Sequence, residues 1–484
     1  MSVAAAFSSA LSGLGAAARQ AEVLSSNVAN AATPGYARRE VALTVRDVAG
    51  TGQGVRVAAI LRDVDLHLLN DRRRAEAGSA AADSRAAFLN RLEDIHGDSD
   101  SPGSLTGRIN ALDSALITAA SQPQSEAGLA AAVTAAGALA DALNAATDAV
   151  QAERLAADRA IAAGVDRINT ALQQIRDLNV EIAAFGGAGR DPSSLMDQRA
   201  QIVDGIAGYL PLREVQRDNG QIALFTTGGA VLLEGSPATL GFTPANGMVA
   251  EMTLAAGALS GLTLNGQPLA TSGPASRIQG GELAALFSLR DDLGTRAQSG
   301  LDALARDLVE RFSQSGLDPT LAPDAPGLFT DAGLALDPAQ NTGLAGRIAL
   351  NSAVDPAAGG SVTRLRDGLA AATAGPSGAA ALLNAWSGAL QAQRPVAGGI
   401  PAGQYSADGL AADLLSGVAT ARLSAETEQS YNGARLSALQ DMQAAQGVDV
   451  DAEMQSLLVI EKNYAANARV IQALDEMLQS LLGI

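Results

Sequence analysis

The chain has 484 residues, a length that corresponds to about three domains. It carries 33 Lys and Arg against 51 Asp and Glu, and the resulting net charge of −18 disfavours binding to nucleic acid. The absence of cysteine excludes disulfides, thiolate catalysis and cysteine-ligated metal centres. No stretch supplies the roughly 18–20 consecutive apolar residues of a membrane span, and the N-terminus lacks the basic start of a cleaved signal peptide. We therefore expect neither feature.

Residues 7–28 have the pattern of an amphipathic helix with a narrow apolar stripe. Apolar side chains recur every three or four positions, which is the spacing of a coiled-coil seam. Thr33, Pro34 and Gly35 predict the end of this helix, because proline removes a hydrogen-bond donor and glycine permits a turn. The stripe consists of Phe7, Leu11, Leu14, Ala18, Ala21, Leu24 and Val28.

Residues 40–62 alternate between apolar and polar side chains, which predicts two short strands. Glycines at positions 50, 52 and 54 predict the loop between them. From residue 63 the pattern becomes helical, and it predicts helices over about 63–96, 103–120, 124–185 and 192–208. The third is longer than an ordinary globular helix and indicates rods packed side by side.

Residues 209–275 are predicted to form a β-rich outer module that projects from the helices. Turn signals occur at Asn219-Gly220, Gly228-Gly229, Asn246-Gly247 and Asn265-Gly266. Residues 316–360 are rich in proline and glycine and are predicted as loop. The rod domain then comprises 63–208, 276–315 and 361–429, and the terminal domain comprises 1–62 and 430–484. The predicted fold is mainly α with an inserted β-rich module.

The last segment has a second narrow apolar stripe at helical spacing, so the two ends are predicted to pair as coiled-coil helices. The apolar surface that one such pair buries does not clearly offset the entropy lost on ordering both ends. We therefore expect the ends to fold fully only when several copies assemble. The stripe consists of Leu457, Ile460, Tyr464, Ala468, Ile471, Leu474, Leu478 and Leu481.

The sequence offers few residues for catalysis. His67 and His96 are its two histidines, and both are interpreted as ordinary helix residues. The one lysine, Lys462, follows no glycine-rich loop, so the sequence contains no P-loop. The acidic residues at 449–453 lack the glycine and distal glutamate of a calcium-binding EF-hand loop. We predict no catalytic, cofactor-binding or metal-binding site and no enzyme activity.

Two stretches beside the terminal helices resemble signatures of one protein family. Residues 24–36, LSSNVANAATPGY, resemble the N-terminal signature of bacterial flagellar rod, hook and hook-associated proteins. Residues 447–453, GVDVDAE, resemble their C-terminal signature, together with 464–471, YAANARVI, and 475–478, DEML. The residues of the first signature are Asn27, Asn30, Thr33, Pro34, Gly35 and Tyr36.

The interior resembles the hook-associated protein 1 family, the first hook–filament junction proteins. The similar stretches are 179–182, NVEI; 195–203, LMDQRAQIV; 219–222, NGQI; and 228–232, GGAVL. Residues 280–284, 289–291 and 301–302 add to them. Hook and distal-rod proteins share the ends but usually lack this long helical interior.

The resemblance implies a structural component of the bacterial flagellum, located at the junction between hook and filament and required for filament assembly. It implies type III export without a cleaved signal peptide and self-association in a ring. The implied partners are the hook protein, the second junction protein and a cytosolic export chaperone that holds the C-terminal helix. Helix packing in the assembly is expected from Leu11, Leu14, Val28, Leu457, Ile460, Tyr464, Ile471, Leu474, Leu478 and Leu481.

Two alternatives remain open at this point. A hook or distal-rod axial protein would carry the same ends. A secreted enzyme with flagellar-type ends would need a catalytic cluster within residues 210–400, and the sequence suggests none there.

Overall fold

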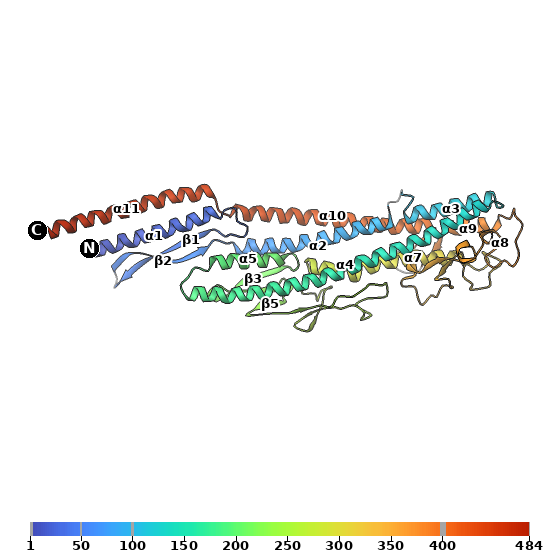
Figure 1. The fold of residues 1–484 in the computed structure, drawn as a ribbon, viewed down its shortest axis with the longest axis horizontal. Coiled ribbons are helices and arrows are strands. Elements are labelled where there is room, and N and C mark those ends of the chain that lie inside the picture. The colour runs from blue at the N-terminus through green and yellow to red at the C-terminus, as the bar shows by residue number, and fades with distance from the viewer. Residues whose placement is uncertain (1–2, 49–50, 98–100, 397–402, 484) are drawn as a thin grey trace.

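The computed structural model describes residues 3–48, 51–97, 101–396 and 403–483, and it shows an elongated molecule with both termini at one end (Figure 1). At that end, α1 (Val3–Ala29) lies beside α11 (Val450–Leu482), and the hairpin of β1 (Arg39–Val48) and β2 (Thr51–Arg62) packs on α1. We call these four elements the terminal bundle. The helical pairing and the hairpin agree with the predictions from the sequence.

The remaining helices form a rod that extends from the bundle (Figure 1). Its long helices are α2 (Leu66–His96), α3 (Leu105–Ser121), α4 (Glu126–Gly187) and α10 (Ala407–Ala445), with α5 (Ser193–Ala207) beside the start of α2. Polar side chains define where these helices begin, because they accept hydrogen bonds from otherwise unpaired N–H groups of the first turn. The residues that cap long helices in this way are Asp65, Ser104, Ser125, Ser406 and Asp449.

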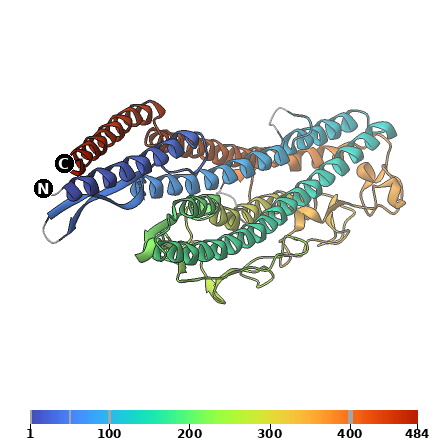
Figure 2. The same cartoon turned by 60° about the vertical axis from the view of Figure 1, so that its left-hand side comes forward.

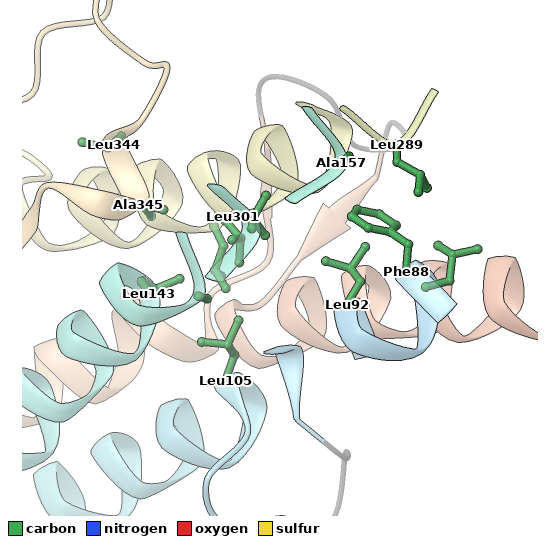
Figure 3. Packing of buried hydrophobic residues seen from close by; sticks show 14 of the residues in the cluster. Phe88, Leu92, Leu105, Leu143, Ala157, Leu289, Leu301, Leu344 and Ala345 are labelled. Carbon is green, nitrogen blue, oxygen red and sulfur yellow. The ribbon is translucent and has the colours of Figure 1, made fainter. Parts of the chain in front are cut away.

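The core of the rod is centred on α4, which would be about 93 Å long at the usual rise per residue. One side of α4 is buried along its whole length, and Figure 3 shows Leu143 of this helix near Leu105 and Leu301. By length and composition α4 could also cross a membrane, but nearly half of the relevant window is buried inside the protein. That burial is typical of the core helix of a soluble domain.

The predicted helix over 276–315 is divided by a π-helical turn. It consists of α6 (Glu282–Ser288), η2 (Leu289–Leu293) and α7 (Gly294–Phe312). The Arg290 carbonyl, within the π turn, accepts a hydrogen bond from Nε of Arg154 at 2.9 Å. Widened turns free a backbone carbonyl from the helical ladder, and here a buried arginine of α4 satisfies it.

The β-rich region contains two small antiparallel sheets. The first has β3 (Leu212–Gln216), β4 (Ile222–Thr226), β5 (Val231–Glu234) and β6 (Ser236–Pro237) in sequential order. The second has β7 (Leu240–Gly241), β8 (Leu262–Leu264) and β9 (Gln267–Leu269). The turns at Asn219-Gly220 and Asn265-Gly266 have positive φ at both positions, as predicted for tight hairpins.

The β-rich module lies lengthwise along α4 (Figures 1 and 2). Polar side chains of α4 bind its backbone directly. Asn169 pairs with both the N–H and the carbonyl of Leu240, and Asn179 does the same with Ile222. Arg154 donates to the carbonyls of Val249 and Met252. These bonds hold residues 242–261 without regular strands, so the hairpin expected at Asn246-Gly247 does not form.

The region after α7 is less helical than predicted. Residues 316–360 contain β10 (Phe329–Asp331), β11 (Ile348–Leu350), η3 (Leu344–Gly346) and η4 (Pro356–Ala358) within loops. Within 361–429, α8 (Arg364–Asp367) is a single turn that ends at Gly368 with φ 112°, and residues 368–380 are irregular. The helix α9 (Ala381–Gln391) and the pair β12 (Arg394–Pro395) and β13 (Gln404–Tyr405) precede α10. Gly375, Pro376 and Gly378 lie close together in the irregular stretch and prevent the helix that the apolar pattern predicts.

The predicted boundary between residues 429 and 430 falls inside α10, which is continuous. Before that boundary α10 packs along α2 where Glu428 pairs with Arg85 and Gln429 donates to Asp83, and after it Asn432 lies close to Gly78 of α2. The chain instead breaks between α10 and α11, at Gln446–Asp449. Residues 430–445 therefore lie in the rod, and only α11 contributes the C-terminal part of the bundle.

Candidate assembly site

The motif at residues 27–36 forms a closed turn at the end of α1. The Asn27 side chain is fully buried, and its Nδ2 donates to the Arg39 carbonyl at 2.9 Å. Its Oδ1 accepts from the Arg39 N–H at 3.0 Å and from the Tyr36 hydroxyl at 2.8 Å. The Arg39 guanidinium lies 4.8 Å from the centre of the Tyr36 ring. One asparagine therefore joins the helix to the start of β1 and fixes the direction of the chain.

The other residues of the motif make hydrogen bonds within the turn and contacts with α5 of the rod. Asn30 donates to the Ser26 carbonyl and accepts from the Thr33 hydroxyl. The Pro34 carbonyl accepts from Nε2 of Gln201 in α5 at 2.6 Å. Gly35 has φ 77°, and a Cβ there would lie 2.6 Å from the Gln201 side chain. Glycine is therefore required here both by conformation and by space.

Asp197 of α5 holds both strands of the hairpin against the rod. Its Oδ1 accepts from Nε of Arg62 at 2.8 Å and from the Ala37 N–H at 3.4 Å. Its Oδ2 accepts from Arg39 at 2.8 Å. Arg39 and Arg62 are directly opposite each other on β1 and β2. A single buried carboxylate thus neutralises two guanidiniums at the base of the hairpin, and we call Asp197, Arg39 and Arg62 the clamp.

A second ion pair joins the two signatures. Nε of Arg38 donates to Oε1 of Glu453 in the first turn of α11 at 2.6 Å, and the Glu453 side chain is only 1% exposed. The hydrogen bond to Glu453 raises the pKa of Arg38 above its ordinary value. A carboxylate in a first turn also stabilises the helix dipole. The start of α11 is thereby fixed beside the turn that follows α1.

Three interior stretches that carry the resemblance contact one another at α5, the helix that carries Asp197. Arg199, four residues before Val203 in α5, donates to the Asn179 side chain and to the Gly220 carbonyl, each at 2.7 Å. Burial lowers the pKa of Arg199 to about 10. The segments 179–182, 195–203 and 219–222 are therefore parts of one junction between α4, α5 and the β-rich module.

The sequence analysis did not identify Asp197, Gln201 or Arg38 as functional residues. Asp197 and Gln201 do lie in the stretch LMDQRAQIV that carried part of the resemblance, and Glu453 ends the stretch GVDVDAE. The motifs could be recognised from the sequence, but only the tertiary structure shows which of their residues bind one another.

The two terminal helices approach each other through small side chains. Ala10 and Ala17 of α1 are buried, and a Cβ added to Gly13 would lie 2.9 Å from the Asn467 side chain of α11. On its other side, α1 contacts the hairpin, where the Ser12 hydroxyl accepts from the Val55 N–H at 3.1 Å. Small residues allow close backbone approach, and they leave little apolar surface to bury.

The predicted interface residues fall into three groups. Ile460 and Leu474 are buried against the rest of the bundle, and Leu14, Val28, Leu457 and Ile471 are half-buried. Leu11, Tyr464 and Leu478 are exposed, with 56% of Leu11 accessible. The Leu481 side chain lies outside the described part of the structure. Packing within one chain therefore uses only part of the predicted set, because the closest face of α1 is made of alanine and glycine.

Several large apolar side chains of the bundle face solvent. On α1 these are Phe7 and Leu11, which are 41% and 56% exposed. On α11 exposed apolar side chains recur at three- and four-residue steps on either side of Lys462 and Asn463, and Ala466 and Ala473 lie among them. Exposed apolar stripes of this length mark protein interaction sites. The exposed members on α11 are Met454, Leu458, Val459, Val470, Met477 and Leu478.

The two histidines lie at opposite ends of α2, about 43 Å apart by helix rise, so they cannot share a metal ion. His96 is buried, which lowers its pKa, and its Nδ1 lies 2.8 Å from the Leu92 carbonyl. Among residues 3–48, 51–97, 101–396 and 403–483, no group of three His, Asp or Glu side chains is arranged to hold a metal. The prediction that the protein is not an enzyme is not tested by this geometry.

Three family models match successive parts of the chain. Residues 89–318 match the flagellar hook-associated protein FlgK helical domain. Residues 439–484 match the C-terminal region of flagellar basal body rod FlgEFG proteins, and residues 7–36 match flagella basal body rod proteins. The helical domain of this chain, residues 89–318, belongs to the FlgK family of flagellar hook-associated proteins. The clamp joins Asp197, within the helical-domain match, to the hairpin that follows the N-terminal rod-type match.

Curated relatives carry the name flagellar hook-associated protein 1. The protein of Salmonella typhimurium is 28% identical over 236 residues, which cover 47% of this chain and 42% of that protein. The Escherichia coli protein is 24% identical over 312 residues, or 63% of this chain and 55% of its own length. The chain thus spans about half the length of these relatives.

The Bacillus subtilis relative is 24% identical over 492 aligned positions, which cover 94% of this chain and 93% of that protein. Among solved structures, the flagellar hook junction protein FlgK from Burkholderia pseudomallei is similar with a TM-score of 0.44 and 22% identity. That match covers 55% of this chain and 47% of the Burkholderia chain.

Proposed function

We propose that this protein is a structural subunit of the bacterial flagellum that forms the junction between hook and filament and is required for filament assembly. It acts by packing its terminal bundle against neighbouring copies in a ring, with the rod outside. The hook protein and the second junction protein are its neighbours along the axis. It performs no catalysis in this role.

The exposed apolar stripes on α1 and α11 carry this proposal. Leu11 on α1 and Val459 on α11 are both more than half exposed, although they belong to helices that already pack against each other. A helix pair with an apolar stripe on each outer side contacts a further copy at both sides. Contacts of this heterologous kind generate closed rings or helical arrays rather than isolated dimers.

The assembly prediction is tested with charges placed on an outward stripe. We expect Leu11→Asp or Val459→Asp to leave a folded, secreted chain that fails to join the hook, because the charge is buried at the copy-to-copy contact. Gln472→Asp, at an exposed polar position of α11, is the matched control. The measurement is the amount of protein in intact flagella and in the culture medium of a deletion strain. Normal filaments with both stripe variants would contradict the proposal.

Leu474→Asp tests something else, because Leu474 is only 6% exposed and lies within the bundle. This variant is expected to separate α11 from α1 in the single chain as well as to block assembly. Limited proteolysis measures this separation. If α11 of the variant resists cleavage as well as α11 of the unmodified protein, the observed packing of Leu474 is contradicted.

Export is proposed to use the flagellar type III route without a cleaved signal peptide, with a cytosolic chaperone covering the apolar stripe of α11. We expect deletion of residues 2–30 to abolish secretion into the medium. The chaperone contact is expected to be lost with Met454→Asp plus Leu458→Asp, measured by co-purification from the cytosol. Secretion of the deletion variant at the normal level would contradict the first part.

A hook or distal-rod position is the second candidate, because two of the three matching family models describe basal body rod proteins. Immunogold labelling along intact flagella separates the two. Gold particles confined to the hook tip support the junction, and particles along the rod or hook support the second candidate.

A further inference from the structure

The terminal bundle and the rod are separate packing units joined at a narrow place. The continuous apolar core of the described residues runs from Ala86 to Ala425 and includes no member of α1, the hairpin or α11. The two units are connected covalently by residues 63–65, between β2 and α2, and by the break at 446–449, between α10 and α11. Polar contacts therefore determine how the bundle is oriented on the rod.

The clamp is the most concentrated of these contacts. The side chains of Asp197, Arg39 and Arg62 are 9%, 14% and 17% exposed, so water screens their charges weakly. Both arginines come from paired positions of one hairpin, whereas the carboxylate comes from α5 of the rod. Nε of Arg39 is buried without a hydrogen-bond partner. The two positive groups thus depend on a single negative group that belongs to the other unit.

Open space lies on both sides of the clamp. A cavity of about 130 Å³ is lined by residues of the turn, the start of α2, α5 and the end of α10, including Gly35 and Gly447. A second cavity of about 240 Å³ lies between β2, α5 and β3. Arg62 lines both. The first cavity is also lined by Asp63, Asp65 and Asp204, so a guanidinium released from Asp197 would find other carboxylates nearby.

We propose that Asp197 is a positioning residue that locks the angle between the terminal bundle and the rod. When its charge is removed, the bundle swings as a unit about residues 63–65 and 446–449, into the space on either side of Arg62. Neither unit unfolds, because the core of the rod does not include the clamp and the α1–α11 contact does not use it. This inference concerns the single chain and does not depend on the proposed assembly.

The physical basis is the cost of leaving partly buried charges unpaired. Asp197→Asn keeps the shape of the side chain but leaves Arg39 and Arg62 side by side without a counter-charge. Breaking a buried ion pair by removing one partner is strongly unfavourable for the geometry that held it. The repulsion between Arg39 and Arg62 decreases when the base of the hairpin moves away from α5 and water reaches the two guanidiniums. That movement changes the angle between the bundle and the rod.

The absence of cysteine makes the angle directly measurable. Ser437→Cys on α10 and Gln472→Cys on α11 place spin labels at exposed positions on either side of the joint. Asn90→Cys with Ser437→Cys places both labels on the rod and reports its integrity. Electron–electron double resonance on the full-length monomer then gives both distance distributions.

In Asp197→Asn we expect the distribution across the joint to broaden about twofold, because the buried pair no longer fixes one geometry. The rod distribution is expected to stay unchanged. Asp177→Asn removes the same charge from an exposed position on α4, where its partner is the adjacent Arg176, and is expected to change neither. Arg62→Gln, which leaves Asp197 paired with Arg39, is expected to give an intermediate broadening.

Unchanged distances across the joint in both Asp197→Asn and Arg62→Gln would overturn the proposal. If Asp197→Asn also broadens the rod distribution, the variant has unfolded, and Arg62→Gln alone then decides. Loss of flagellar assembly with an unaltered joint would count against the clamp and leave the proposed function intact.

Discussion

The rod and the terminal bundle bury their apolar residues in different ways. In the rod, large side chains such as Trp386, Phe312 and Phe329 are fully buried, and their rings lie 5.2–5.3 Å apart. In the bundle, the fully packed positions of α1 are mostly alanine, and large side chains such as Leu11 are exposed. Apolar burial stabilises in proportion to area, so the rod is stable by itself and the bundle gains most from further partners.

Polar groups differ in the same way. Many buried polar groups of the rod bind within the rod, as where Arg311 donates to Asp307 and to the carbonyls of Ala389, Ala392 and Tyr405. The bundle is oriented by a few polar contacts to the rod at one end. Different residues therefore stabilise the rod and set the angle of the bundle on the rod, so substitutions can change one without the other.

The largest expected effect is in the rod. Phe312→Ala removes a fully buried ring and is expected to lower the free energy of unfolding by about 3–5 kcal/mol, because the neighbouring rings cannot collapse into the space. Denaturant unfolding followed by circular dichroism measures it. Leu334→Ala, at a position that is 71% exposed, is the control and is expected to change little. An equal loss in both would mean that the rod core is not the main source of stability.

A smaller effect is expected at the turn. Asn27→Ala leaves the Arg39 N–H, the Arg39 carbonyl and the Tyr36 hydroxyl without their buried partner, at a local cost of about 2–3 kcal/mol. Amide hydrogen exchange at the start of β1 should become faster, with exchange in α4 unaltered. Asn30→Ala, whose side chain bonds within its own turn, should have a weaker effect. Faster exchange throughout the rod would contradict the separation of the two units.

The close approach of the terminal helices gives a third test. Gly13→Leu places a side chain where Asn467 lies and is expected to cost about 1–2 kcal/mol through overpacking. Gly15→Leu is the matched control, since nothing lies within 4 Å of a Cβ at that position. Protease sensitivity of α11 should rise only in the first variant. Equal sensitivity would show that α1 does not contact α11 through Gly13.

The smallest effect concerns pH and the rod. Burial lowers the pKa of His96 below its ordinary value of 6.5, so the unfolded chain binds this proton more readily than the folded one. Stability from this group is complete above about pH 6.5 and is lost as the pH falls from there toward the folded pKa. His96→Gln should remove this part of the pH dependence. An identical pH profile for the variant would refute the assignment.

The helices and the hairpin were predictable because their signals are local. Periodicity located α2, α3, α4 and α5 within a few residues, and Asn219-Gly220 and Asn265-Gly266 identified real turns. The same local reasoning failed at 242–261 and 368–380, where side chains of α4 and closely spaced glycine and proline determine the path. It also placed the start of the C-terminal part of the bundle at residue 430, although α10 continues to Ala445 and the chain breaks only at Gln446–Asp449.

The candidate site was predictable as a set of motifs and not as a set of contacts. Asn27 to Tyr36 were identified from the sequence, and the structure joins them in one turn. Gln201, which binds Pro34, and Asp197, which binds Arg39 just after the motif, lie more than 150 residues away, and sequence spacing carries no information about which distant residue meets them. The same holds for Gly13 and Asn467, since a glycine in a helix does not reveal what approaches it.

The sequence by itself determined the helical class, the turn motif and the apolar stripes, because each depends on residues close together in the chain. Only the tertiary structure decided which stripes are buried, where the bundle ends and which carboxylate neutralises the paired arginines. Those outcomes depend on the packing of distant segments: alanine and glycine bring α1 onto α11, and that contact leaves Leu11 and Val459 exposed.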